Sequence, residues 1–303
     1  RGAFKSAGAY PASSTLYCHD SGAPVVIGSL EDTMVVLGAS PVIGSADLAG
    51  PYFVGEQGSF TVTMTNPANG GTYTNLSATI LIENITEADF TTIEVRYPGT
   101  ENWITLSPED DGAGNLVIAI PSTAAFAITP GSTWELDFRG TFLTSGHYDV
   151  TGTLYCHDGG EPIVIGSLSD TMGVYARPVI SSPDLAGPYH VGELGSFSVT
   201  MTNPADGYTY TSMSASIEIK NISLADFTSI EVENPISGNW ITLTAVEQGD
   251  NVVINIPATN AFATNPGESW TLNFRGAFKS AGSYPASGTL YCHDSGEAVA
   301  IGS

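Results

Sequence analysis

The sequence is poor in basic residues. Of its 303 residues, 8 are Lys or Arg and 31 are Asp or Glu, so the formal net charge is −23. Binding to nucleic acid or to an anionic membrane surface depends on Lys and Arg, and this charge balance therefore argues against both kinds of partner. No apolar run approaches the roughly 18 residues of a spanning helix, so we expect no membrane span in this segment.

Cysteine is also scarce. The chain contains three cysteines, and no two of them have the CxxC spacing of a zinc knuckle. It opens on Arg1-Gly2 without a Met or a signal peptide, which we interpret as the start of a mature or excised piece. Hydrophobic residues make up 42%, enough for packed cores, and the length predicts about two domains.

The chain repeats itself. A block that begins Arg-Gly and ends Leu-Tyr-Cys-His-Asp starts at Arg1, Arg139 and Arg275. A spacing of 136–138 residues exceeds that of solenoid repeats, so each repeat should be a whole domain with its own core. Residues 1–29 match residues 275–303 at 24 positions but residues 139–167 at only 17, so two domain types alternate.

Each repeat has the pattern of a β-sheet protein. Apolar residues alternate with polar ones in four runs: Phe60, Val62 and Met64; Leu76, Ala78, Ile80 and Ile82; Leu116, Ile118 and Ile120; Trp134, Leu136 and Phe138. Such alternation indicates one face in a core and one in water. Gly, Pro, Asn and Asp clusters separate the runs every 8–15 residues, which predicts an all-β fold of antiparallel sandwiches.

The strand pattern also predicts the domain boundaries. We expect residues 1–38 to be the final strands of a preceding repeat, 39–176 to be a complete repeat, and 177–303 to be a second repeat without its final strand. Two explanations of the missing strand stay open: the chain is a window of a longer array, or a neighbouring chain donates the strand. We favour the window, because residues 1–29 duplicate 275–303 and a following chain would bring a redundant strand.

Three segments carry a resemblance to a known family. GSFTVTMTNPANGGTYTNLSATILIEN, PGSTWELDFRGTF and GHYDVTGTLY resemble the immunoglobulin-like conserved repeats of very large prokaryotic surface proteins. The resemblance implies tandem immunoglobulin-like sandwiches in a linear array and an extracellular stalk, adhesin or filament subunit. The recurring cysteine departs from that family's pattern.

The recurring Cys-His-Asp string invites a nucleophilic triad. Side chains on a strand alternate faces, so Cys156 and Asp158 would point one way and His157 the other, and we assign no catalytic residue and no enzyme activity. We expect Cys18, Cys156 and Cys292 to be buried free thiols, because Cys156 shares an apolar strand face. Alternatives are a disulfide crosslink to a laterally packed chain and a zinc site completed by another strand or chain.

Other candidate sites are sequons, acids and tryptophans. Asn75, Asn84 and Asn221 begin glycosylation sequons, and the latter two are equivalent in the two repeats. No EF-hand loop occurs, so we predict no cofactor, with calcium at recurring acids such as Asp47 and Asp184 as the alternative. Trp103 and its counterpart Trp240 could face outward and stack a sugar, whereas Trp134 should lie in the core.

These observations predict a structural extracellular protein at the cell surface, the building block of a filament or stalk. We expect head-to-tail self-association, with lateral contacts as a further mode, since head-to-tail contacts give open fibres. The alternatives are an adhesin repeat that binds carbohydrate or a host surface, and the spacer region of a larger extracellular enzyme.

Overall fold

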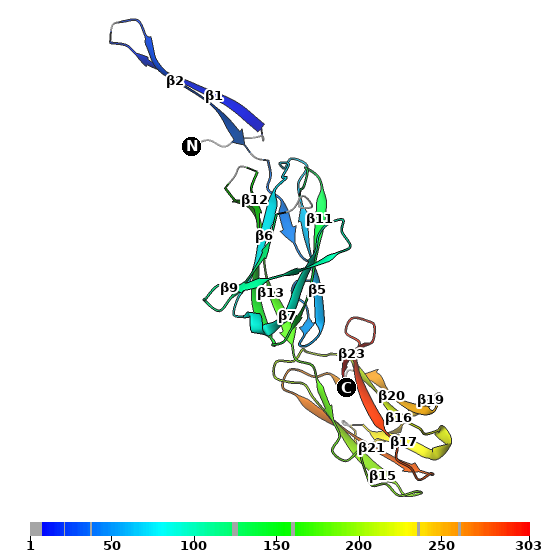
Figure 1. The fold of residues 1–303 in the computed structure, drawn as a ribbon. Helices are drawn as coiled ribbons and strands as arrows, with labels where there is room; N and C mark the ends of the chain where they lie inside the picture. The colour runs from blue at the N-terminus through cyan, green and yellow to red at the C-terminus, as the bar shows by residue number, and fades with distance from the viewer. Residues whose placement is uncertain are drawn as a thin grey trace. The chain divides into compact units, whose positions relative to one another are not determined.

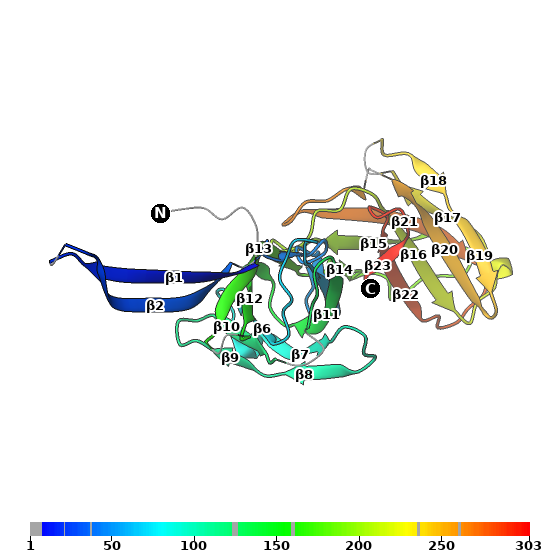
Figure 2. The same cartoon turned by 90° about the horizontal axis from the view of Figure 1, so that it is seen from above.

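The computed structural model describes residues 8–20, 22–36, 38–122, 127–158, 161–234, 237–259 and 262–303. The chain divides into two compact units, Arg1–Val174 and Tyr175–Ser303. Strands form nearly all of the regular structure, and every strand pair with a described register is antiparallel, which confirms the predicted all-β fold (Figures 1 and 2). Within these ranges, no helix is long and apolar enough to cross a membrane.

The first unit contains a sandwich of two sheets. One sheet has the order β3-β5-β11-β7-β8, with the bounds Val42–Gly44, Gln57–Thr65, Thr133–Phe142, Phe90–Arg96 and Trp103–Leu106. The other has the order β4-β13-β12-β6-β10-β9, with the bounds Tyr52–Phe53, Ile163–Tyr175, Gly146–Cys156, Leu76–Ile82, Leu116–Ile120 and Pro108–Asp110. A short 3-10 helix, η1 (Glu87–Asp89), precedes β7.

The alternating apolar residues meet between these two sheets. Met64, Leu76 and Leu116 have no more than 1% of their surface exposed, and they come from three different strands. Phe60 and Phe138 lie opposite each other in β5 and β11 and stack with ring centroids 4.9 Å apart. Burial of each large apolar side chain stabilises the fold by about 1.5–3 kcal/mol, so the period-two pattern holds the sheets face to face.

The first unit also contains a separate hairpin. Strands β1 (Gly8–Cys18) and β2 (Val25–Val36) pair along their length and form a two-stranded sheet of their own. Their pairing repeats that of β12 and β13 residue for residue, including the register shift after Leu16, which matches the shift after Leu154. Sequence repetition therefore reproduces local strand pairing in the hairpin.

The second unit builds a sandwich of the same kind. One sheet has the order β14-β15-β21-β17-β18, with the bounds Val179–Ser181, Gly195–Thr202, Ser269–Phe278, Phe227–Glu233 and Trp240–Thr242. The other has the order β19-β20-β16-β22-β23, with the bounds Thr244–Gln248, Asn251–Thr259, Met213–Lys220, Ala286–Cys292 and Val299–Gly302. The 3-10 helix η3 (Leu224–Asp226) takes the place of η1.

The two sandwiches differ at one edge. In the first, β13 has 13 residues and pairs with β4 on its outer side. In the second, the corresponding strand β23 has 4 residues, and Tyr189-His190, the counterparts of β4, lie outside the named strands.

A buried asparagine anchors the same turn in both units. Asn66 is 0% exposed; its Nδ2 donates to the Gly71 carbonyl at 2.7 Å, and its main-chain carbonyl accepts from the Gly131 N–H at 2.9 Å. Asn203 repeats both bonds in the second unit, at 2.8 Å and 3.0 Å. A Cβ on Gly70 would overlap the Asn66 side-chain oxygen, so this close approach requires glycine.

We predict that Gly70→Ala lowers the free energy of unfolding of the first unit by about 1–3 kcal/mol, because the added methyl group must displace the Asn66 side chain. The matched control is Gly71→Ala, whose Cβ would meet its nearest neighbour at 3.4 Å and should cost less than about 0.5 kcal/mol. Urea unfolding of the two variants measures the difference. Equal losses of stability would contradict the role given to this turn.

Candidate functional site

The recurring Cys-His-Asp string lies at the end of β12 in the first unit. The Cys156 side chain is 4% exposed and belongs to the core. The next residue, His157, places its Nε2 2.7 Å from the Ser77 hydroxyl on β6. The thiol and the imidazole thus lie in different surroundings, one among core residues and the other against a polar side chain.

Asp158 holds the turn after β12 to the segment that precedes β6. Its carboxylate accepts the Thr74 N–H at 2.9 Å and the Thr74 hydroxyl at 2.7 Å. In the second unit, Asp294 accepts the Thr211 N–H at 2.9 Å, the Thr211 hydroxyl at 2.6 Å and the Ser212 N–H at 2.8 Å. The acidic member of each string therefore closes a loop by hydrogen bonds.

The electrostatics of the string suit structure rather than nucleophilic attack. Burial raises the pKa of the Cys156 thiol, and burial raises the pKa of Cys292 as well. A nucleophilic cysteine needs the opposite shift, because the thiolate is the reactive form. Burial of Asp158 raises its pKa, but the hydrogen bonds from Thr74 outweigh this effect and leave the pKa below its ordinary value.

The three cysteines are free thiols. Cys156 is buried, whereas Cys18 in the hairpin and Cys292 in the second unit are half-buried. Each has the same strand partner position, Val25 for Cys18, Ile163 for Cys156 and Val299 for Cys292. The prediction of a lateral crosslink stays a prediction.

The sequon asparagines occupy exposed turns. Asn84 and Asn221 have φ angles of 58° and 57°, the left-handed region that asparagine tolerates better than most residues. Asn84 lies two residues after the end of β6, and Asn221 directly follows β16. Asn75 is also exposed, and its side-chain oxygen accepts a hydrogen bond from Ser122. Glycosylation at these three positions stays a prediction.

The recurring acids bind neighbouring donors of the protein. One Asp47 oxygen accepts the Thr61 N–H at 3.0 Å and the Ser45 hydroxyl at 3.0 Å. Asp184 accepts the Ser198 N–H at 2.9 Å in the same place of the second unit. Among the described residues, no group of three or more His, Cys, Asp or Glu side chains could hold a metal ion.

An arginine–tryptophan cluster recurs on the first sheet of each sandwich. The Arg139 guanidinium lies 4.2 Å from the Trp103 ring centroid, and its Nε donates to Glu94 at 2.6 Å. In the second unit, Arg275 lies 4.1 Å from the Trp240 ring and donates to Glu231 at 2.6 Å.

The arginine covers one face of the tryptophan ring, the kind of surface on which a sugar would stack, and such a cation–π contact contributes about 0.5–1 kcal/mol at exposed sites. Sequence reasoning missed this cluster. The recurrence of an Arg, a Glu and a Trp at equivalent positions was the available signal.

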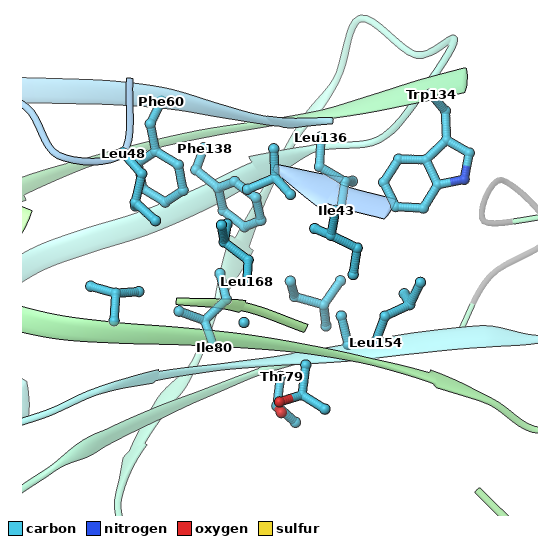
Figure 3. Close-up of a pocket in the computed structure, with 16 residues that line it drawn as sticks. Ile43, Leu48, Phe60, Thr79, Ile80, Trp134, Leu136, Phe138, Leu154 and Leu168 are labelled. Carbon is cyan, nitrogen blue, oxygen red and sulfur yellow. The ribbon is translucent and has the colours of Figure 1, made fainter. Parts of the chain in front are cut away.

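The cavity of the first sandwich is a packing gap. It has a volume of about 40 Å³ and lies between the sheets, among Phe60, Phe138, Leu154 and Trp134 (Figure 3). Ligand pockets usually hold 300–1,000 Å³ and combine apolar walls with a few polar groups. This cavity is too small for a ligand, and Trp134 lines it as a core residue.

Comparisons with known proteins find similar solved structures but no known family. No family model matches the chain, and no curated protein matches it. Among solved structures, the C-terminal domain of BspA, an AgI/II polypeptide of Streptococcus agalactiae, is 9% identical over 87% of this chain and 98% of its own, with a TM-score of 0.44. The C-terminal domain of the antigen I/II-family protein AspA of Streptococcus pyogenes is 11% identical over 88% and 98%, with a TM-score of 0.39.

A third match comes from another class of protein. AvmM, which catalyses macrocyclization in alchivemycin A biosynthesis, is 15% identical over 45% of this chain and 88% of its own, with a TM-score of 0.36. These three likenesses lie below a TM-score of 0.5, and none of them identifies a function.

We predict that Asp158→Asn destabilises the first unit by about 1 kcal/mol at neutral pH, because two charge-assisted hydrogen bonds become neutral at a largely exposed site. Because the pKa of Asp158 is lower in the folded state, the carboxylate stabilises the fold above the unfolded-state pKa of about 3.9. This contribution is lost as the pH falls through the lower folded-state pKa. The difference in the free energy of unfolding between wild type and variant, measured by urea unfolding, should therefore vanish between about pH 5 and pH 2. Asp20→Asn, at the same motif position in the hairpin, should change little; a gap that persists at pH 2 would argue against this role.

We also predict that the three thiols differ in reactivity. With Ellman's reagent at pH 8, Cys18 should react at least about tenfold faster than Cys156, because Cys156 is 4% exposed and its pKa is raised. Rapid-mixing absorbance gives the rates, and Cys18→Ser should remove the fast phase. Similar rates for Cys18 and Cys156 would mean that the core of the first unit is open to solvent.

Proposed function

We propose that this chain is a structural segment of an extracellular surface filament or stalk, built from immunoglobulin-like sandwiches. The observation that carries the proposal is that the recurring polar residues serve internal contacts in both units. Asp158 and Asp294 close the same loop, and Arg139 and Arg275 cover the same tryptophan position. A repeat whose recurring polar residues stabilise its own sheets is suited to bear mechanical load.

The strand order supports the immunoglobulin-like part of the proposal. In the first unit, β3-β5-β11 faces β13-β12-β6. In chain order these correspond to strands A, B and E over G, F and C of an immunoglobulin-like sandwich. The first sheet continues beyond β11 with β7 and β8, and the second continues beyond β6 with β10 and β9, so each sheet is wider than in the seven-stranded form, which has four strands in one sheet and three in the other.

The charge supports an exposed, extended assembly. A net charge of −23 keeps neighbouring chains apart and favours solubility. Head-to-tail contacts between repeats would then build a fibre, because such contacts do not close on themselves unless the rotation closes a ring. Electrostatic repulsion along the sides would limit lateral association to specific contacts.

The proposed role is non-catalytic. The string that most resembles an active site contains a thiol whose pKa is raised and an imidazole that contacts a serine. The proposed role also ranks above carbohydrate binding, because Trp103 and Trp240, the candidate stacking residues, each lie under an arginine.

Electron microscopy of the native material tests the proposal. Strands of 8–10 residues at about 3.3 Å per residue, with their loops, give a domain roughly 35–45 Å long, so two domain types should repeat about every 70–90 Å along a fibre. Negative-stain images at increasing protein concentration should show fibres with this axial repeat. Isolated particles at every concentration, or short rods that carry a distinct tip, would contradict a filament and favour a spacer.

A further inference from the structure

One side of the second sandwich is formed by a single continuous segment. β18 is the edge strand of the first sheet of this unit, and after Leu243 the chain crosses over to become β19, the edge strand of the other sheet. β19 pairs with β20 from Thr244 opposite Asn255 to Gln248 opposite Asn251, and Figure 2 shows it at the margin of its sheet. Within the described part of this unit, no strand pairs with the outer side of β19, so its outward main-chain N–H and C=O groups are open to another strand.

The corresponding edge of the first sandwich is protected. Residues 102–106 (NWITL) recur unchanged as residues 239–243, so the two edges begin alike. The next five residues differ: they read SPEDD at 107–111 and TAVEQ at 244–248. Proline and charged side chains on an edge strand hinder its pairing with another chain, and β9 is also the shorter strand, with 3 residues against 5 in β19. The first unit therefore has a blocked edge where the second has an open one.

The open edge is uncharged and suited to strand pairing. Residues 239–246 contain no charged residue, proline or glycine. Val246 is 43% exposed, and Thr244, two positions away on the same face, is exposed as well; both are β-branched strand formers. The acid that follows, Glu247, is turned to its own unit, because its Oε1 accepts the Leu224 N–H at 2.9 Å.

The charge of the chain makes this edge a place of contact between copies. A net charge of −23 keeps two copies apart wherever their acids face each other. An uncharged edge lets two backbones approach to the roughly 4.8 Å that separates paired strands. The first unit carries three acids, Glu109, Asp110 and Asp111, at the same place and would repel a second copy there.

A two-fold axis at Ala245 gives the pairing that uses the uncharged residues. Antiparallel pairing about this axis places Ala245 opposite Ala245 of the second copy, and Val246 opposite Thr244 of the second copy. Glu247 then lies outside the three central pairs. Opposed β-branched side chains on one face stabilise such a pair of strands.

We propose that the β19 edge of the second unit pairs with the β19 edge of a second copy of this chain, antiparallel about Ala245. This contact rests on the proposed filament function and gives the filament a lateral mode of association. The occupant is a second copy because one edge supplies both halves of the pairing, and because the first unit differs from the second by the very residues that protect an edge strand. In two neighbouring fibres many such edges act together, so that weak single contacts add through multivalency.

Sedimentation equilibrium of the 303-residue chain tests the contact at 0.15 M salt, where charge repulsion is screened beyond about 8 Å. The wild-type chain should form a dimer, and Val246→Glu should weaken dimerisation at least tenfold, because it places two carboxylates at the centre of the pairing. The matched control is Ile104→Glu, which adds the same charge at a residue of similar exposure, 46%, on the protected edge. I104E should dimerise like wild type, and equal dimerisation of wild type and V246E would overturn the proposal.

Cysteine crosslinking tests the register. With the three native cysteines replaced by alanine, Ala245→Cys should give a disulfide-linked dimer on mild oxidation, because directly opposed residues have Cα atoms about 4.5–5.5 Å apart. Gln248→Cys is the control, since its two copies would lie six residue positions apart, about 20 Å. Pro108→Cys places the thiol at the same position of the protected edge and should also stay uncrosslinked.

The outcomes separate this contact from the filament itself. A crosslinked dimer with A245C, and none with Q248C or P108C, supports the pairing of two β19 edges. Crosslinking of P108C or Q248C as fast as that of A245C, or a wild-type chain without lateral dimers, would overturn it. Fibres that keep their axial repeat would leave the filament proposal standing in that case, whereas β19 dimers without any fibre would overturn the filament and leave this contact standing.

Discussion

The pairing of β12 with β13 is the constraint on which the first sandwich depends. The sheet that contains them must present a continuous apolar face, and Met172 and Val174 complete that face only when β13 lies in register along β12. A shift of one residue would turn both side chains to solvent.

The alternation of side chains along a strand also separates the residues of the recurring Cys-His-Asp string. Consecutive residues at a strand end face different surroundings, so Cys156 lies in the core while the ring of His157 contacts Ser77. The string resembles a nucleophilic triad in sequence, but in the structure each of its three residues makes a separate structural contact. Burial of the thiol raises its pKa and favours the unreactive protonated form, whereas hydrogen bonds to Asp158 lower the pKa of that carboxyl and keep it ionised.

Some of these features could be predicted from the chain and others could not. The alternation of Leu116, Ile118 and Ile120 predicted a buried strand face, and all three residues are buried. The cluster of Arg139, Glu94 and Trp103 could not be predicted, because its members lie 36 to 45 positions from Arg139 and meet only when β7, β8 and β11 assemble into one sheet. The outward-facing tryptophan expected for sugar stacking is covered by that arginine.

The all-β class, the repeat length and the faces of the strands could be predicted from the amino-acid sequence, because these depend on residue periodicity and turn residues along the chain. Which polar side chains meet depends on how the strands assemble, since contacts such as that of Asp158 with Thr74 join residues 84 positions apart.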